Sequence, residues 1–273
     1  CMKAQRRAPI YKFGVRVPRD HREAVQLKEA QGHTKWTEAE AIELKQINDY
    51  DTLRDLGKDV ALPKGYTKIQ VHFVYDCKHD GRFKARLVAG GHLTQADKED
   101  SYSGVVSLKS MRLAMLVGEM NGLSSMVGDI GNAYLESFTR ERVGFIAGPE
   151  FGTYAGHTLI IVKALYGLRT SGARFHEKLS DTLRQEGFVP SLADPDLWIR
   201  DADDCYEYVC VYVDDLMAVM KNPGEFFRRL SDPSLHNYKL KGVGVPEYHL
   251  GGNFGRDQTG PFGGVPNLTS RRC

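Results

Sequence analysis

Residues 208–220 read Tyr208-Val-Cys-Val-Tyr-Val-Asp214-Asp215-Leu-Met-Ala-Val-Met220, two apolar β-prone runs that meet at an acidic pair. The pattern predicts a hairpin with Asp214 and Asp215 at its tip. Asp-Asp is a poor substitute for Asn-Gly in a tight turn, and adjacent carboxylates repel each other unless a cation compensates their charge. A cation site and a solvated polar turn between buried strands are the two interpretations of this stretch.

A third carboxylate, Asp129, follows the short apolar stretch at residues 126–128 and precedes a polar Gly-Asn dipeptide at residues 131–132. This order is typical of a carboxylate at the end of a strand, above a sheet. Asp129, Asp214 and Asp215 together would offer hard oxygen ligands to two Mg²⁺ ions, which prefer carboxylates plus substrate phosphates to an all-protein cage. Two such ions, about 4 Å apart, suit in-line phosphoryl transfer.

Length and composition indicate a globular chain with a sizeable core. The 273 residues are 41% hydrophobic, which is enough for one large domain or two small ones. The longest apolar runs are far shorter than the roughly 20 residues that a membrane span requires. A net charge of +2 does not by itself indicate nucleic-acid binding, so only the local placement of charged residues could indicate it.

The ends of the chain and its cysteines indicate a non-secreted piece of a longer product. The first thirty residues contain no apolar signal-peptide core, and residue 1 is Cys rather than Met. Five cysteines form neither a CxxC pair nor a dense framework, which suits a reducing compartment and predicts no zinc site.

Helices and strands are expected at several places along the chain. Residues 1–32 lack clear periodicity and are expected to be a connector, whereas residues 34–47 should form a helix with Thr34 as its cap and Trp36 packed inward. The β-prone runs Ile69–Tyr75 and Phe83–Val88 surround an Asp-Gly dipeptide and predict a hairpin.

Helical spacing and helix stop signals predict two further helices later in the chain. In the helix expected at residues 110–120, the apolar face is predicted to consist of Leu113, Leu116, Val117 and Met120. A second amphipathic helix is expected at residues 175–183, followed by a strand at residues 197–200. The Gly- and Pro-rich residues 257–273 are expected to be a poorly ordered tail.

Four stretches resemble the boxes of one enzyme family. Residues 212–215 (Tyr-Val-Asp-Asp) resemble the active-site box of reverse transcriptases. Lys84-Ala-Arg-Leu-Val-Ala89, Asp129-Ile-Gly-Asn-Ala-Tyr-Leu135 and Leu165-Tyr-Gly-Leu-Arg169 stand in the order and approximate spacing of the copia-type polymerase domain. Weaker similarity at residues 36–44 and 248–252 extends the resemblance over residues 33–256. The chain is thus similar to the polymerase segment of a copia-type LTR retrotransposon Pol polyprotein.

The resemblance implies an α+β right-hand polymerase with an antiparallel palm sheet flanked by helices. It places the fingers near residues 60–125, the palm near residues 126–256, and leaves the thumb largely missing. It also implies an RNA-directed DNA polymerase that transfers nucleotides from dNTPs to a primer 3′-hydroxyl on an RNA or DNA template. Two Mg²⁺ ions, or Mn²⁺ in their place, would be bound by Asp129, Asp214 and Asp215, which are the implied catalytic residues.

The same resemblance assigns nucleotide-binding residues. Lys84 and Arg86 alternate along a strand, so they share a face, and the family's fingers hairpin closes on the incoming triphosphate. The alternative for both is an ordinary solvated strand face. Tyr134 matches the position whose ring packs under the incoming sugar and excludes ribose; its alternative is a core tyrosine at a helix start.

Template and primer contacts are implied at Arg169, Tyr212, Tyr248 and Gly251. Many relatives carry Gln directly after the basic residue of the Leu165–Arg169 stretch, whereas this chain has Thr170. Arg169 is therefore assigned only to the template backbone.

The resemblance implies that most of the thumb and the ribonuclease H segment are missing, and two other interpretations then remain. One is a decayed retroelement fragment that keeps the fold and the aspartates; the other is a domesticated nucleic-acid-binding module without catalysis. Pure binding does not require three aspartates together with Lys84 and Tyr134, which argues against the module. The family implies partners in the other Pol segments, no membrane, and a cytoplasmic virus-like particle or the nucleus as location.

Overall fold

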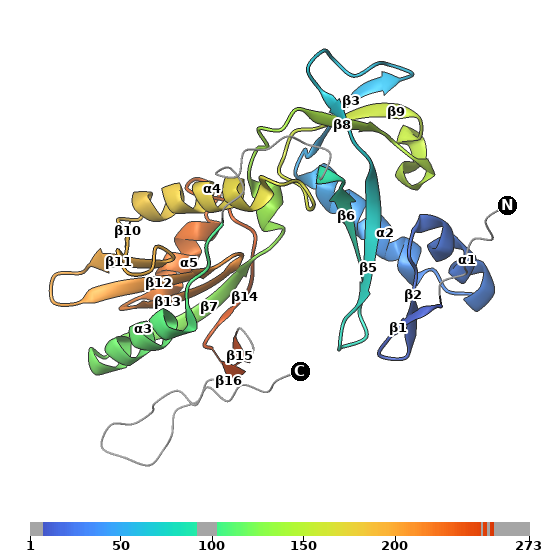
Figure 1. Ribbon diagram of the computed structural model, residues 1–273. Helices are drawn as coiled ribbons and strands as arrows, with labels where there is room; N and C mark the ends of the chain where they lie inside the picture. Colours follow the sequence, from blue (N-terminus) through green and yellow to red (C-terminus); the bar gives the residue numbers. More distant parts are fainter. Residues whose placement is uncertain (1–7, 92–102, 247, 250–251, 254–273) are drawn as a thin grey trace. The chain divides into compact units, whose positions relative to one another are not determined.

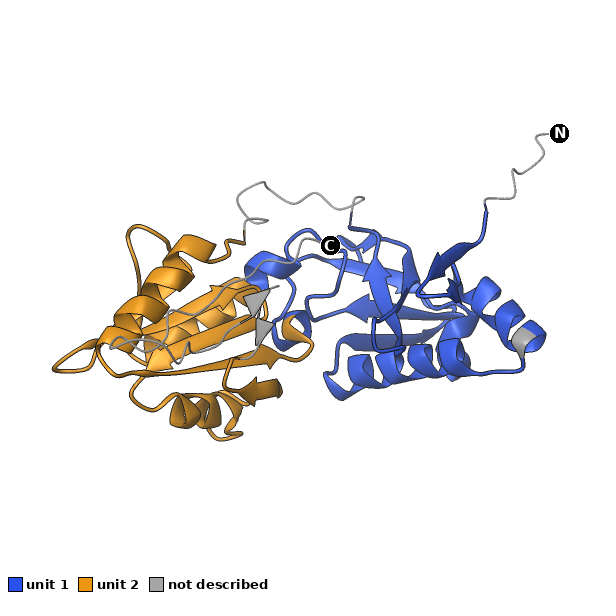
Figure 2. Ribbon diagram, turned by 90° about the horizontal axis from the view of Figure 1, so that it is seen from below, with its two compact units in different colours: residues 1–102, 134–174 blue, residues 103–133, 175–273 orange. Residues whose placement is uncertain are grey.

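The chain folds into two compact units (Figure 2). The computed structural model describes residues 8–91, 103–246, 248–249 and 252–253. Unit 1 comprises residues 1–102 and 134–174, and unit 2 comprises residues 103–133 and 175–273. Both units combine helices with mainly antiparallel strands, so the predicted mixture of α and β structure is confirmed. No helix in the described part of the chain is long and apolar enough to cross a bilayer.

The division between the units is discontinuous, whereas the sequence suggested contiguous ranges that meet near residue 125. Residues 134–174 belong to unit 1 because β8 and β9 pair with strands from the first part of the chain in one sheet of order β3-β9-β8-β4. The elements of unit 1 are β1 (Ile10–Lys12), β2 (Val15–Val17), α1 (His21–Gln31), α2 (Lys35–Asp49), β3 (Leu53–Lys58), β4 (Thr67–Lys68), β5 (Val71–Cys77), β6 (Phe83–Ala89), η3 (Ala133–Glu136), β8 (Val143–Ile146), η4 (Pro149–Tyr154) and β9 (His157–Ile161).

The predicted helix after residue 34 is α2, which packs against β6. Trp36 is 1% exposed, as expected, and its ring lies 4.4 Å from Phe83 and 5.7 Å from Tyr75 between centroids. Thr34 occupies the N-cap position, but its side chain makes no capping bond to the backbone and donates to the Glu38 carboxylate instead. The cap position was therefore predicted correctly, and the capping bond was not.

Residues 10–31 differ from the expected connector, because they form β1, β2 and α1 within unit 1. Asp20 caps α1 by accepting a hydrogen bond from the Glu23 backbone at 2.8 Å, and Ala24 and Leu27 are buried in the unit 1 core. Among residues 21–30 of this helix only these two are buried, although Val25 and Ala30 are also apolar, so the apolar residues do not form a clear periodic stripe. Packing on α2 adds to the stability that the Asp20 cap gives this helix.

The predicted hairpin in unit 1 is confirmed as β5 and β6. Its strands run in register from Val71 opposite Ala89 to Cys77 opposite Phe83, and Gly81 occupies the turn at φ +79°. On β6, Ala85 and Leu87 are buried while Lys84 and Arg86 are half-buried on the other face. The predicted alternation of cations and core residues is therefore correct.

Unit 2 is built on an antiparallel sheet of order β10-β11-β12-β13-β7-β14 with helices on both faces (Figure 1). On one face, α3 lies so close that a Cβ on Gly118 would be 2.3 Å from Val219; on the other, a Cβ on Gly128 would be 2.8 Å from the Phe227 ring of α5. The elements are α3 (Leu108–Met120), β7 (Ser124–Ile130), α4 (Ser171–Gln185), β10 (Val189–Pro190), β11 (Leu197–Asp201), β12 (Tyr206–Tyr212), β13 (Asp215–Met220), α5 (Pro223–Ser231), β14 (Leu240–Gly244), β15 (Tyr248–His249) and β16 (Gly252–Asn253). Helix α4 begins in unit 1, because residues up to Arg174 belong there.

The apolar face predicted for the helix at residues 110–120 is wrong. Leu113, Leu116 and Met120 are exposed, Met120 to 76%, whereas the opposite face carries the buried residues Met111, Ala114, Met115 and Gly118. Both sets have the same i, i+3, i+4, i+7 spacing, so periodicity could not distinguish them. The face that contains Ala114 and Gly118 packs on the sheet because Gly118 permits close approach to Val219.

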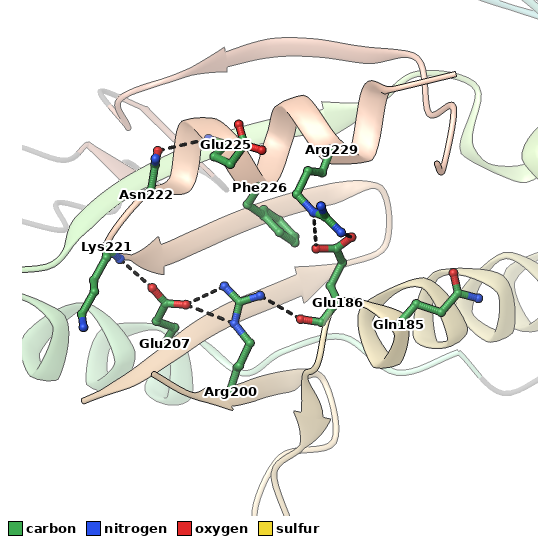
Figure 3. A pocket seen from close by; sticks show the side chains of 9 residues that line it. All are labelled: Gln185, Glu186, Arg200, Glu207, Lys221, Asn222, Glu225, Phe226 and Arg229. Atoms are coloured by element: carbon green, nitrogen blue, oxygen red, sulfur yellow. Dashed lines mark hydrogen bonds and ion pairs between the residues drawn. The ribbon is translucent and has the colours of Figure 1, made fainter. Parts of the chain in front are cut away.

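A buried ionic network joins α5 to the end of α4. Glu186 accepts hydrogen bonds from Arg229 at 2.9 Å and His236 at 2.8 Å, and its side chain is 3% exposed. Glu186 and Arg229 border a cavity of about 280 Å³, which is also lined by Glu207. Glu207 binds Arg200 at 2.6 Å and the Lys221 backbone at 2.8 Å (Figure 3). Burial alone would raise the pKa of Glu186, but the bonds from Arg229 and His236 outweigh it and hold the pKa below its usual value.

Replacing Glu186 with Gln is expected to lower the free energy of unfolding by about 2–4 kcal/mol, because Arg229 and His236 would lose their shared buried anion. Since the folded pKa is depressed, this contribution should be present at neutral pH and be lost as the pH falls through the folded pKa. Urea denaturation at pH 7 and at a series of pH values below 4.5 measures both effects. As a control, Glu225→Gln removes the exposed pair with Arg228 and should leave the midpoint nearly unchanged.

Candidate active site

The acidic pair lies at the turn of the hairpin formed by β12 and β13. Tyr212 pairs with Asp215, so the turn consists of Val213 and Asp214 alone. Val213 has φ +57°, a left-handed conformation that is costly for a β-branched residue and that glycine usually occupies in such turns. Backbone strain of this kind is characteristic of functional sites. The predicted hairpin is confirmed, with Asp214 in the turn and Asp215 at the start of β13.

Asp129 lies directly opposite Asp215 on the neighbouring strand β7. Opposed residues of antiparallel strands share a face, with Cβ atoms about 5 Å apart, so these two carboxylates project side by side. The backbone N–H of Ile130 donates to the Asp214 carbonyl at 2.8 Å, which ties the turn to β7. The sheet thereby brings Asp129, Asp214 and Asp215 to one end, and all three are partly exposed.

The local electrostatics disfavour three ionised carboxylates. Burial, then the charge of Asp214, then that of Asp129 raise the pKa of Asp215 from 3.8 to about 6. Like charges opposite one another destabilise a sheet unless a cation neutralises them.

Sequence reasoning missed Lys241, which is the cross-strand partner of Asp129 on β14. The Lys241 ammonium nitrogen lies 3.0 Å from the position that a Cβ on Gly131 would occupy, so glycine leaves room for it. Because the pairing of β14 with β7 depends on long-range register, no local pattern around Lys241 indicated this position.

The three carboxylates are the kind of hard oxygen ligand that Mg²⁺ prefers. Among the residues that the structure describes, no three His, Cys, Asp or Glu side chains form a ready-made metal cage. Mg²⁺ is usually held by one or two carboxylates together with substrate phosphates and water. The opposed pair Asp129 and Asp215, with the neighbouring Asp214, offers hard oxygen donors and an unfavourable negative charge that a divalent cation would relieve.

Metal-free protein is expected to show a pH dependence that originates at Asp215. The folded pKa of Asp215, about 6, exceeds the ordinary 3.8, so the folded state is favoured when this carboxyl is protonated. This contribution to the free energy of unfolding is complete below about pH 4 and is lost as the pH rises through 6. Partial exposure limits the effect to about 1–2 kcal/mol. In EDTA, Asp215→Asn should raise the melting temperature relative to the unaltered chain more at pH 7.5 than at pH 4.5. Equal differences at the two pH values would contradict this origin.

The nucleotide-binding candidates lie in unit 1. The Arg86 guanidinium on β6 lies 4.8 Å from the ring centroid of Tyr166, and the Tyr134 ring in η3 lies 4.8 Å from the same ring at 55°. Lys84 shares a face with Arg86, and Arg169 is exposed. Tyr166 was not singled out, although it belongs to the Leu165–Arg169 stretch that the family resemblance indicated.

The loop that carries Tyr166 is docked on the end of β6. The Ala89 backbone N–H donates to the Tyr166 carbonyl at 2.7 Å, and a Cβ on Gly167 would lie 2.1 Å from the Ala89 oxygen. Gly167 also has φ +91°, and a Cβ on Gly91 would lie 2.1 Å from the Gly167 oxygen. Only glycine fits at these two positions, so the Leu-Tyr-Gly-Leu stretch is typical of a close backbone approach.

Of the remaining template and primer candidates, only Tyr212 has a side chain among the described residues. Tyr212 ends β12 as the cross-strand partner of Asp215 and is 39% exposed. Tyr248 lies in β15, but its side chain falls outside the described residues, as do Gly251 and the tail at residues 257–273.

Comparison with known proteins identifies a family over most of the chain. Residues 56–261 match the family described as reverse transcriptase (RNA-dependent DNA polymerase). The chain is 27% identical over 207 residues to the retrovirus-related Pol polyprotein from transposon RE1 of Arabidopsis thaliana, covering 72% of this chain and 14% of that protein. It is 26% identical over 198 residues to the transposon Ty1-NL1 Gag-Pol polyprotein of Saccharomyces cerevisiae, covering 72% and 11%.

Among solved structures, a foamy viral protease-reverse transcriptase in complex with double-stranded DNA matches with 14% identity and a TM-score of 0.44, covering 81% of this chain and 34% of that one. The chain thus spans only a small part of its Pol relatives. Since the family match includes the stretches that carry Asp129, Asp214 and Asp215, this chain belongs to the reverse transcriptase (RNA-dependent DNA polymerase) family, as a segment of the copia retrotransposon type.

Proposed function

We propose that this chain is the polymerase core of a retrotransposon Pol polyprotein, which extends a primer 3′-hydroxyl with dNTPs on an RNA or DNA template. The observation that carries the proposal is the cross-strand pair Asp129 and Asp215 beside the strained turn at Asp214. Unit 2 would serve as the palm, because it holds these carboxylates, and unit 1 as the fingers, because it holds Lys84 and Arg86. Other Pol segments would complete the enzyme.

Asp129 and Asp214 would hold two divalent cations, Mg²⁺ or Mn²⁺, and Asp215 would assist them. When bound, these ions supply charge neutralisation at the triphosphate and acidify the primer hydroxyl. The chain itself provides no nucleophile. Its part is to hold the carboxylates in fixed positions on the sheet. The register between β7 and β13 fixes Asp129 opposite Asp215, and the bond from Ile130 to the Asp214 carbonyl fixes the turn.

The incoming nucleotide would meet the cationic face of β6. Lys84 offers a point charge and Arg86 a planar fork, and both project from one face of the strand. Tyr134 would lie under the sugar, with its ring supported by that of Tyr166. Arg169, which is exposed, would contact the template backbone, and Tyr212, beside the carboxylates, would contact the primer end.

Primer extension tests the proposal directly. The purified chain is incubated with a DNA primer on an RNA template, dNTPs and Mg²⁺, and products are resolved by length. Metal-dependent incorporation would support the polymerase assignment. An absence of incorporation under Mg²⁺ and Mn²⁺ alike, with primer-template still bound, would contradict it and indicate a decayed fragment or a binding module.

Tyr134→Ala is expected to weaken discrimination against ribonucleotides, because removal of the ring opens space next to the sugar 2′-hydroxyl. The ratio of kcat/KM for dNTP over the matching rNTP should fall about tenfold or more, a difference of roughly 1.4 kcal/mol. Tyr134→Phe is the matched control and should retain the discrimination. An Ala variant with an unchanged ratio would remove Tyr134 from this role.

A further inference from the structure

We propose that Tyr166 is a positioning residue for the incoming nucleotide: its ring holds the Arg86 guanidinium and the Tyr134 ring in place on the triphosphate-binding face of unit 1. This inference rests on the proposed polymerase function. It adds a residue that belongs to neither the carboxylate group nor the cation pair.

The first argument is that three separate segments meet at the Tyr166 ring. Arg86 comes from β6, Tyr134 from η3, and Tyr166 from the loop after β9. The guanidinium carbon lies 4.8 Å from the Tyr166 centroid, within the range of a cation–π interaction. The Tyr134 centroid lies 4.8 Å away on a tilted ring plane, within the range of an aromatic pair. Tyr166 is thus the shared neighbour of two of the three nucleotide-binding candidates, Arg86 and Tyr134.

The second argument is that the backbone of Tyr166 is anchored while its ring stays partly exposed. Leu165 and Leu168 are buried on either side, and the Ser171 hydroxyl donates to the Leu165 carbonyl at 2.7 Å. The Tyr166 carbonyl accepts from Ala89, three residues after Arg86 on the same strand segment. A ring on so fixed a backbone can hold a mobile side chain in one place.

The third argument concerns what Arg86 needs in order to bind a triphosphate. A free arginine side chain loses rotamer freedom when it binds, and this loss weakens affinity. A guanidinium held against a ring has already lost part of that freedom, while its N–H edge can still donate two parallel bonds to phosphate oxygens. The arrangement therefore predicts an effect on nucleotide affinity more than on the chemical step.

The Tyr166 ring, and not its hydroxyl, carries this role. Tyr166→Phe should therefore retain the KM for dNTP within about twofold, whereas Tyr166→Leu should raise it about 3- to 30-fold with little change in kcat, as expected for loss of a cation–π contact. Arg86→Ala should raise the KM as well. Because both substitutions remove the same interaction, the double variant should raise it little beyond Arg86→Ala.

Steady-state primer extension with each variant, together with its melting temperature, measures these effects. Phe138→Leu is a matched control, since it removes another cation–π pair of unit 1, with the Lys163 ammonium 3.9 Å from the ring, and should leave the KM unchanged. Should Tyr166→Leu fail to fold, Tyr166→Met provides a longer side chain without a ring and should raise the KM similarly.

Each outcome decides between the two proposals. An active chain whose KM is unaffected by Tyr166→Leu or Tyr166→Met, or whose Tyr166 and Arg86 effects multiply independently, overturns the positioning role and leaves the polymerase function intact. An equal KM increase in Tyr166→Phe also overturns it, because the hydroxyl would then be responsible. A chain that neither binds nor incorporates dNTPs overturns both.

Discussion

Replacement of Asp214 with Asn is expected to reduce Mg²⁺-dependent primer extension by about two to three orders of magnitude. The amide keeps the size of the side chain but loses the negative charge that a divalent cation requires, and preorganised electrostatic groups of this kind contribute about that much to catalysis. The strained turn at Val213 and the bond from Ile130 to the Asp214 carbonyl involve the backbone alone, so the fold should persist. Single-nucleotide incorporation under saturating dNTP measures the loss.

A matched control separates metal binding from a general effect of charge. Asp203 is an exposed residue with φ +69° in the loop between β11 and β12, and Asn tolerates that conformation well. Asp203→Asn should therefore extend primers at the normal rate. If Asp214→Asn also did so, while its melting temperature matched that of the unaltered chain, the assignment of Asp214 to the catalytic group would be wrong.

Gly167→Ala is expected to have the largest effect on unit 1, with an unfolding free energy lower by about 3 kcal/mol or more. The new methyl carbon would lie 2.1 Å from the Ala89 backbone oxygen and 2.7 Å from the Val88 side chain, and φ at this position is +91°. Backbone atoms cannot move aside as a flexible side chain would, so the loop has to leave β6. Urea denaturation monitored by circular dichroism measures the change.

Gly81→Ala is the control, because Gly81 also has positive φ, +79°, yet nothing lies within 4 Å of a Cβ there. It should show only the cost of the left-handed conformation, about 1 kcal/mol. A Gly167→Ala variant no less stable than Gly81→Ala would indicate that the loop docks less tightly on β6 than the close approach implies.

Local patterns in the sequence were sufficient to predict the two hairpins that hold several of the candidate site residues. The two apolar runs around Asp214 and Asp215 predicted the hairpin, and the Asp-Gly dipeptide predicted the pairing of β5 with β6. Alternation along β6 separated Lys84 and Arg86 from the buried residues between them. Such features depend on neighbours within a few residues, which is why one sequence reveals them.

Local patterns failed to predict which face of α3 is buried and that residues 21–31 form a helix. Helix α3 has two apolar stripes with identical spacing, and close packing at Gly118 decided which one is buried. The apolar residues of α1 form no clear stripe, so its sequence did not indicate a helix, and only the structure shows that it packs on α2. The buried face of α3 and the helix α1 are both compatible with local helix propensity, but the tertiary contacts had to be known to identify them.

The sequence by itself determined the strands of the two predicted hairpins, the acidic turn, and the family to which these stretches belong. Only the tertiary structure placed Asp129 opposite Asp215, Lys241 beside Asp129, and Tyr166 between Arg86 and Tyr134. It also decided that residues 134–174 join unit 1. The physical reason is that these relations depend on strand register and loop docking between segments far apart in the chain, and no local periodicity specifies how such segments meet.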